Sequence, residues 1–326
     1  MRIFPAPARK LFLAIAFPCL FGLCADSACA QSVIATIPVT QPAQSAVNPA
    51  LGYAYVGDGS SIAVISESTN SIVSTIDVGA SEGIWAIVAD YKTGRVYACG
   101  GSQIWVIDGH TNTLIDTLSV PAAWLAINVR TDTIYASDFN QTVYVINGAT
   151  NTVTTTITVY EALQLAVNPV TNRIYIAANN PNQGEVTVID GSTNQVVTNI
   201  DISGSDFTNF VSVDPLRNLV YATDVNSTGS PNGVVAVING ATNTVTTTIT
   251  VPGEPQQIAV DPVTRLLYLP NMTLNEVQVI DGRTNQLTST TIPVGQSPYW
   301  ATLDPYHKLL YVTNLFSESV SVINTR

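Results

Sequence analysis

Cysteine is scarce in this sequence and unevenly placed. Three of the four cysteines, Cys19, Cys24 and Cys29, fall within the first 30 residues. The rest of the chain keeps Cys99 alone, so it has no partner for an internal disulfide and no C-x-x-C-H haem motif. We therefore expect Cys99 to be a small, buried apolar residue.

Histidine is nearly absent as well. The chain has two, His110 and His307, and both stand in short turns between predicted strands. We expect both to be solvated turn residues. The rest of the chain then has no histidine for a metal site or an acid–base centre. The sequence also lacks a G-x-S-x-G elbow and a phosphate-binding glycine loop. With no catalytic constellation and no cofactor motif, it favours a protein that is not an enzyme, without deciding the question.

Basic residues are few, with 12 Lys and Arg against 23 Asp and Glu, a net charge of −11. Nucleic-acid affinity rests mainly on Lys and Arg neutralising phosphates, so we expect no nucleic-acid partner. No apolar run after residue 30 approaches the ~20 residues that span a bilayer. We therefore expect no membrane span in residues 31–326.

The first 30 residues have the order of parts of a secretory signal peptide. Arg2, Arg9 and Lys10 precede a short apolar run over 11–24, and Ala-Cys-Ala at 28–30 resembles a cleavage site. A membrane anchor is disfavoured by the length of the run, and a lipoprotein signal by the residues before each cysteine. The segment predicts export to the periplasm, the medium or the surface of a bacterium. Its removal would bring the net charge to −13.

The remaining chain is an internal repeat. Each unit has an Asn or Asp, usually followed by Pro, and a tyrosine seven residues later. The tyrosines, spaced by 38 to 47 residues, are Tyr55, Tyr97, Tyr135, Tyr175, Tyr221, Tyr268 and Tyr311.

Each unit predicts four short strands. The first precedes the Asx-Pro turn, the second holds the tyrosine, and the third is an alternating run such as 186–189. A turn of the type Asp-Gly-x-Thr-Asn follows, in which we expect the glycine to adopt positive φ. The fourth strand is rich in Val, Ile and Thr, which suits a half-exposed strand. Four strands per roughly 40 to 45 residues indicate a propeller blade.

The chain ends complete the ring. The last unit stops after its third strand, and residues 33–39 resemble a fourth strand without a blade of its own. We predict an all-β, seven-bladed β-propeller over 31–326, closed by residues 33–39 beside 320–323, and we expect a monomer. Its blades start near residues 46, 86, 125, 166, 211, 258 and 301.

The repeat is similar to a known family. Residues 311–314 are Tyr-Val-Thr-Asn, and the Val-Ile-Asp-Gly-x-Thr-Asn segments recur around them. In these features the chain resembles the YVTN family of β-propeller repeat proteins over essentially all of 33–326. The resemblance implies a secreted or cell-surface bacterial propeller, with similar blades in surface-layer and exported redox proteins. It carries no catalytic residues with it.

Function is expected on one face of the ring. The Asx-Pro and Asp-Gly-x-Thr-Asn turns share one face, which we call the turn face. The other connections, including the longer loops 178–184 and 224–233, share the opposite face, the loop face. On the loop face, Asp58, Asp138 and Asp224 can be ligands for Ca²⁺ or ordinary caps of the loops that follow.

Aromatic residues are expected at the channel mouth on the loop face. Trp85, Trp124, Phe210, Tyr299 and Trp300 stand at or just before the first strands of their blades. They can form a concave site for a ligand or partner, or they can plug the channel. We expect a non-catalytic scaffold that binds a protein or small molecule there. The alternatives are a calcium-assisted, lactonase-like hydrolase and a redox-partner or surface-layer propeller.

Overall fold

The computed structural model describes residues 31–180, 183–202, 207–224 and 231–326. The predicted signal peptide, residues 1–30, and parts of the two longer loops lie outside these ranges. Residues 31–326 form one compact unit. Among the described residues no helix is long and apolar enough to cross a membrane.

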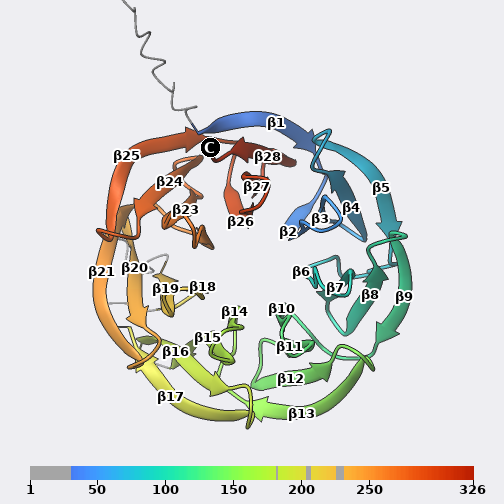
Figure 1. Ribbon diagram of the computed structural model, residues 1–326, viewed down its shortest axis with the longest axis horizontal. Coiled ribbons are helices and arrows are strands. Elements are labelled where there is room, and N and C mark those ends of the chain that lie inside the picture. Colours follow the sequence, from blue (N-terminus) through green and yellow to red (C-terminus); the bar gives the residue numbers. More distant parts are fainter. Residues whose placement is uncertain (1–30, 181–182, 203–206, 225–230) are drawn as a thin grey trace, which may run out of the picture. The chain divides into compact units, whose positions relative to one another are not determined.

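Seven four-stranded antiparallel sheets surround a central axis, as Figure 1 shows. In chain order, blades 1 to 3 consist of β2 (Pro42–Asn48), β3 (Tyr53–Asp58), β4 (Ser61–Ser66), β5 (Ser71–Asp77); β6 (Ala86–Ala89), β7 (Arg95–Gly100), β8 (Gln103–Asp108), β9 (Thr113–Leu118); and β10 (Trp124–Asn128), β11 (Thr133–Ser137), β12 (Thr142–Asn147), β13 (Thr152–Thr158). Blades 4 to 6 consist of β14 (Leu165–Asn168), β15 (Arg173–Asn180), β16 (Gln183–Asp190), β17 (Gln195–Asp201); β18 (Phe210–Asp214), β19 (Leu219–Asp224), β20 (Asn232–Asn239), β21 (Thr244–Pro252); and β22 (Ala259–Val260), β23 (Leu266–Asn271), β24 (Glu276–Asp281), β25 (Gln286–Pro293). Blade 7 consists of β26 (Pro298–Asp304), β27 (Leu309–Asn314), β28 (Ser319–Asn324) and β1 (Ser32–Pro38).

The predicted closure is confirmed. β1 is the outermost strand of blade 7 and runs antiparallel to β28, with Val33 opposite Ile323 and Ile37 opposite Val320. Figure 1 shows β1 beside β28 and the C-terminus at this point of the ring. The structure is therefore the seven-bladed, all-β propeller that the repeat predicts.

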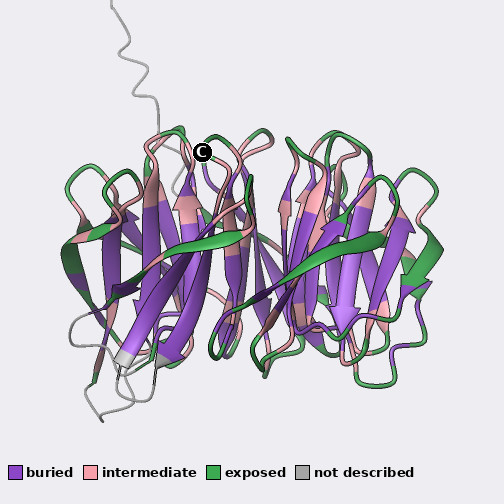
Figure 2. Ribbon diagram, turned by 90° about the horizontal axis from the view of Figure 1, so that it is seen from below, coloured by how far each residue is buried: buried purple, intermediate pink, exposed green. Residues whose placement is uncertain are grey.

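The innermost strands line the channel. The residues two positions before each Asx are mostly small, and four of the seven are alanines. Together with their neighbours they surround a cavity of about 360 Å³. Outer strands are mostly exposed, and Figure 2 shows buried residues filling the inner strands of the blades. Each outer strand buries one residue near its end: Ile37, Ile76, Leu118, Ile157, Ile200, Ile249 and Ile292. In β21, Val251 is buried as well.

The seven repeated tyrosines lie at the seams between neighbouring blades, and two of them donate hydrogen bonds across a seam. All are buried, with at most 1% of the residue exposed. Tyr55 Oη donates a hydrogen bond to the carbonyl oxygen of Gly109 (3.3 Å), and Tyr97 Oη donates to that of Gly148 (3.3 Å). Each bond joins the second strand of one blade to the Asp-Gly-x-Thr-Asn turn of the next. The interval between tyrosines in the sequence therefore corresponds to one blade.

The expected role of the turn glycine was wrong. Positive φ falls on the last residue of the turn, for example Asn112 (φ 54°) and Asn285 (φ 55°), and not on the glycine. Asn tolerates this left-handed conformation better than most residues. The glycine is needed for space, because a Cβ on Gly191 would lie 2.5 Å from Asn172 Oδ1 and 2.9 Å from Tyr135 Oη.

Candidate functional site

The five predicted aromatic residues lie together. With Phe139, they form one continuous group, which we call the aromatic cluster. Every ring centroid lies within 6.5 Å of another. The contacting pairs are Trp85–Phe139, Trp124–Phe139, Trp124–Phe210, Trp124–Trp300, Phe210–Tyr299, Phe210–Trp300 and Tyr299–Trp300.

The aromatic cluster crosses the channel axis. Trp124 starts β10 in blade 3, Phe210 starts β18 in blade 5, and Trp300 lies in β26 of blade 7. None of these blades is next to another in the ring. The centroid of the Trp300 ring is nevertheless 5.2 Å from that of Trp124 and 5.1 Å from that of Phe210. Side chains of alternate blades can meet only by reaching over the channel, so the cluster spans its mouth on the loop face.

The aromatic cluster has a buried base and an accessible outer layer. Phe210 and Trp300 are 2% and 3% exposed, whereas Phe139 is 46% exposed. Trp85, Trp124 and Tyr299 are intermediate. Most contacts are edge-to-face or tilted, a geometry that contributes about 0.5–1.5 kcal/mol per pair. The base is therefore rigid, and the outer rings are available to another molecule.

Phe139 is held over the cluster by a strained loop. Its φ is 65°, a conformation that costs a bulky residue of the order of 1–3 kcal/mol. Asp138 Oδ1 accepts hydrogen bonds from the backbone N–H groups of Asn140 (2.9 Å) and Thr142 (3.1 Å). These bonds close the loop and direct Phe139 onto Trp85 and Trp124. The repeat gave no sign of Phe139, because it follows the end of the second strand in a loop that differs between blades.

The indole nitrogens of the cluster differ in their partners. Trp85 Nε1 donates to the carbonyl oxygen of Glu82 (3.0 Å). Trp124 Nε1 is buried and has no acceptor among the described residues. In two other blades a glutamine stands at the position of Trp124, and its side chain bonds the next blade. Gln44 Oε1 accepts from the N–H of Ile87 (3.2 Å), and Gln164 Oε1 accepts from that of Val211 (2.7 Å).

The three candidate calcium ligands are not brought together in the described residues. Asp58 Oδ1 accepts from the N–H of Gln41 (3.2 Å), Asp138 closes the Phe139 loop, and Asp224 is buried at the end of β19. Within the described ranges, only one group of three His, Cys, Asp or Glu residues has its ligand atoms within 4.8 Å, and it contains none of them. A calcium site at these carboxylates therefore stays a prediction without support from geometry.

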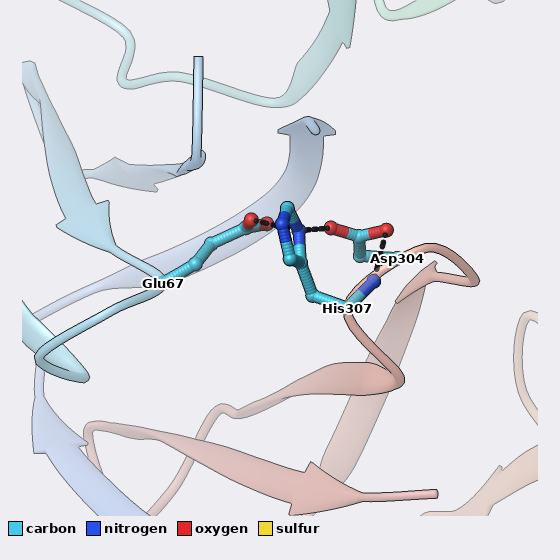
Figure 3. A group of neighbouring side chains, drawn as sticks. All are labelled: Glu67, Asp304 and His307. Atoms are coloured by element: carbon cyan, nitrogen blue, oxygen red, sulfur yellow. Dashed lines mark hydrogen bonds and ion pairs between the residues drawn. The ribbon is translucent and has the colours of Figure 1, made fainter. Parts of the chain in front are cut away.

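That group, Glu67, Asp304 and His307, lies on the turn face and was missed. We call it the seam cluster, because Glu67 follows β4 in blade 1, whereas Asp304 ends β26 and His307 follows it in blade 7. Figure 3 shows the His307 imidazole between the two carboxylates. His307 is a turn residue with a side chain 39% exposed, as expected, but its contacts with two carboxylates were not predicted. His110 is also as expected, with a side chain 60% exposed beside Asp108.

The electrostatics of the seam cluster follow from burial. The Glu67 side chain is 4% exposed and that of Asp304 is fully buried. Burial and the neighbouring Asp304 carboxylate raise the pKa of Glu67 to about 8. The hydrogen bond to Asp304 raises the pKa of His307 above its ordinary value. Comparing the turns of the seven blades could have found the site, since Glu67 replaces the glycine found in five of them.

Comparison with known proteins shows the fold alone. No family model matches the sequence, and no curated protein matches it. Among solved structures, a chain of Kuenenia stuttgartiensis hydrazine synthase is similar with a TM-score of 0.77 and 17% identity, over 88% of this chain and 96% of that one. A chain of a mitotic checkpoint complex is similar with a TM-score of 0.77 and 13% identity, over 98% of both chains. These likenesses support the β-propeller and leave the YVTN resemblance as an interpretation of the motifs.

Proposed function

We propose that this chain is an exported, non-catalytic binding scaffold that holds a protein partner or small molecule on its aromatic cluster. The observation that supports this most is the strained Phe139 loop. A backbone strain of this kind persists where the surroundings over-determine it, and such positions concentrate at binding sites. A cluster that served only to plug the channel would need Trp124, Phe210 and Trp300 and would not need Phe139 above them.

The rest of the loop face suits the same role. Tyr160, Leu274 and Phe316 lie in other connections on this face and are 46%, 46% and 73% exposed. Large aromatic anchors surrounded by further apolar residues are typical of surfaces that bind other molecules. No contact of the described residues favours calcium-assisted hydrolysis, redox partnership or surface-layer assembly over this proposal.

The proposal is tested by capturing partners from the extracellular medium and from a periplasmic extract of the native organism. Phe139→Ala combined with Trp85→Ala removes two accessible rings and leaves the buried base intact. We expect the partner bound by the wild type to bind the double variant roughly thirtyfold more weakly, the effect of losing about 2 kcal/mol at a hot spot. Tyr91→Ala is the matched control, because Tyr91 is 49% exposed on the turn face.

A fluorescence titration identifies the site directly. Three of the four tryptophans belong to the aromatic cluster, and the fourth, Trp105, is 2% exposed in β8. In a Trp105→Phe background, binding of the captured partner should change the emission of the cluster alone. The proposal fails if partner recovery is the same for the double variant and the wild type, or if Tyr91→Ala abolishes it instead.

A further inference from the structure

We propose that the seam cluster is a binding site for a divalent transition-metal ion of the zinc class, holding blade 7 to blade 1 where the ring closes. The three side chains converge closely. His307 Nδ1 is 2.6 Å from Asp304 Oδ2 and 2.9 Å from Glu67 Oε2. One imidazole nitrogen and two carboxylate oxygens are a donor set that suits Zn²⁺, with water completing the coordination.

Glu67 and His307 both depart from the commonest residue of the repeat at their positions, and both lie at this seam. Five blades have a glycine at the position of Glu67: Gly109, Gly148, Gly191, Gly240 and Gly282. Four have a threonine at the position of His307: Thr93, Thr131, Thr171 and Thr264. The two departures come from opposite ends of the chain and meet only in the closed ring.

A third position at this seam lacks a side chain, as the equivalent Gly94 does in blade 2. In blade 4 a Cβ at the turn glycine would meet Asn172 Oδ1 at 2.5 Å. Blade 1 has Gly52 at the position of Asn172, so no side chain occupies that space. The backbone N–H of Glu67 still bonds the carbonyl oxygen of Gly52 (3.0 Å), as the turn requires. Gly52 therefore leaves room beside Glu67 where the seams at Asn172 and Asn218 have an amide.

Asp304 is oriented for a ligand role. Its Oδ1 accepts from the backbone N–H groups of Tyr306 (2.7 Å) and His307 (3.1 Å), which leaves Oδ2 facing the seam. In two other seams the second atom of the Asx side chain bonds the next blade, as when Asn128 Nδ2 donates to Asn172 Oδ1 (2.7 Å). With Gly52 there, Asp304 has no such partner. Hydrogen bonds that fix a carboxylate in this way are common around metal ligands.

The charge of the seam cluster also favours a cation. Two carboxylates lie buried beside each other, and His307 supplies at most one positive charge. Lys308 Nζ is 3.6 Å from Asp261 Oδ2, in the seam between blades 6 and 7. A divalent ion would neutralise both carboxylates and be held by their oxygens and by the imidazole nitrogen. At about 2.1 Å from each ligand atom, it would require these atoms to separate by under roughly 1 Å.

Solvent can reach the site. A cavity of about 540 Å³ has Glu67 and His307 in its wall, together with Tyr53, Asn324 and Arg326. The His307 side chain is 39% exposed. The metal-free alternative is an ionic bridge, for which blade 5 offers a precedent. There Arg217, at the position of His307, places Nη1 2.7 Å from Asp214 Oδ2.

The experiment measures Zn²⁺ binding to the purified protein after treatment with a chelator and desalting. We expect one equivalent per chain by calorimetry, and a melting temperature that rises with Zn²⁺ concentration because the ion binds only the folded ring. Glu67→Gly and His307→Thr restore the residues of the other blades, so both variants should fold. Each should bind Zn²⁺ at least about tenfold more weakly. His110→Thr, which changes the other histidine, should bind it as the wild type does.

Three results would overturn the proposal. One is the absence of saturable binding near one equivalent. A second is equal binding by His307→Thr and the wild type. A third is a larger stabilisation by Ca²⁺ than by Zn²⁺, since Ca²⁺ prefers six to eight oxygens and would indicate a different site.

Discussion

The residue four positions after each Asx adopts the left-handed conformation in every blade. These residues are Gly52, Gly94, Asp132, Asn172, Asn218, Arg265 and Lys308. Where this residue is Asn, it also accepts a bond from the Asx of the preceding blade, as Asn218 Oδ1 does from Asn168 Nδ2 (2.8 Å). Asp132 instead stands beside Asp90 of blade 2. Burial and the charge of Asp90 raise the pKa of Asp132.

We expect Asp132→Asn to stabilise the protein by roughly half a kcal/mol at pH 7. A carboxyl whose folded-state pKa is raised weakens the fold once the pH exceeds that pKa, and the penalty disappears below the unfolded-state pKa. The gain should therefore be largest near pH 7 and shrink as the pH falls towards 4. Urea unfolding at both pH values checks this. Asp201→Asn, an equal change of charge on the exposed strand β17, is the control. A variant less stable than the wild type at pH 7 would contradict the explanation.

Elements were predicted more completely than the contacts between them. The strands and turns follow from local patterns that repeat seven times, so each blade supported the assignment of the others. The aromatic cluster was predicted in part, because inner-strand residues have a place in the repeat. Phe139 and Glu67 were not, because each departs from the repeat. The role of such a residue becomes clear only from its neighbours in space, which are Trp85 for Phe139 and Asp304 for Glu67.

The turn glycine offers a test at the scale of one element. Gly191→Ala places a Cβ against Asn172 Oδ1 and Tyr135 Oη, and overpacking of this kind costs about 1–3 kcal/mol. Blade 1 avoids the clash with Gly52. We therefore expect Gly191→Ala to cost less in an Asn172→Gly background than in the wild type.

A double-mutant cycle on the free energy of unfolding measures this coupling. Strict additivity of the two changes would show that the glycine serves another purpose. It would also weaken the argument that Gly52 makes room for Glu67 at the seam.

At the scale of the whole molecule, the two faces of the ring have different tasks. Turns on one face lie at the seams between blades, where buried tyrosines and Asx side chains meet the next blade, and they include the seam cluster. On the other face, where the loops vary, inner strands of three alternate blades place aromatic rings across the channel. Both features require a closed ring, because Trp124–Trp300 and Glu67–His307 join residues far apart in the chain.

Closure itself rests on β1. Ile37 is 5% exposed and packs with Val39 against Val56 of blade 1 and Val320 of blade 7. We expect Ile37→Ala to lower the free energy of unfolding by about 2–4 kcal/mol. Ile34→Ala on the same strand should have little effect, because Ile34 is 47% exposed. Urea unfolding of the two variants, with light scattering to detect association, gives the comparison.

Loss of β1 would leave β28 as an unpaired edge, and such edges pair with other chains. Aggregation should therefore accompany Ile37→Ala and not Ile34→Ala. Equal stability of the two variants would mean that the ring stays closed without the apolar contacts of β1.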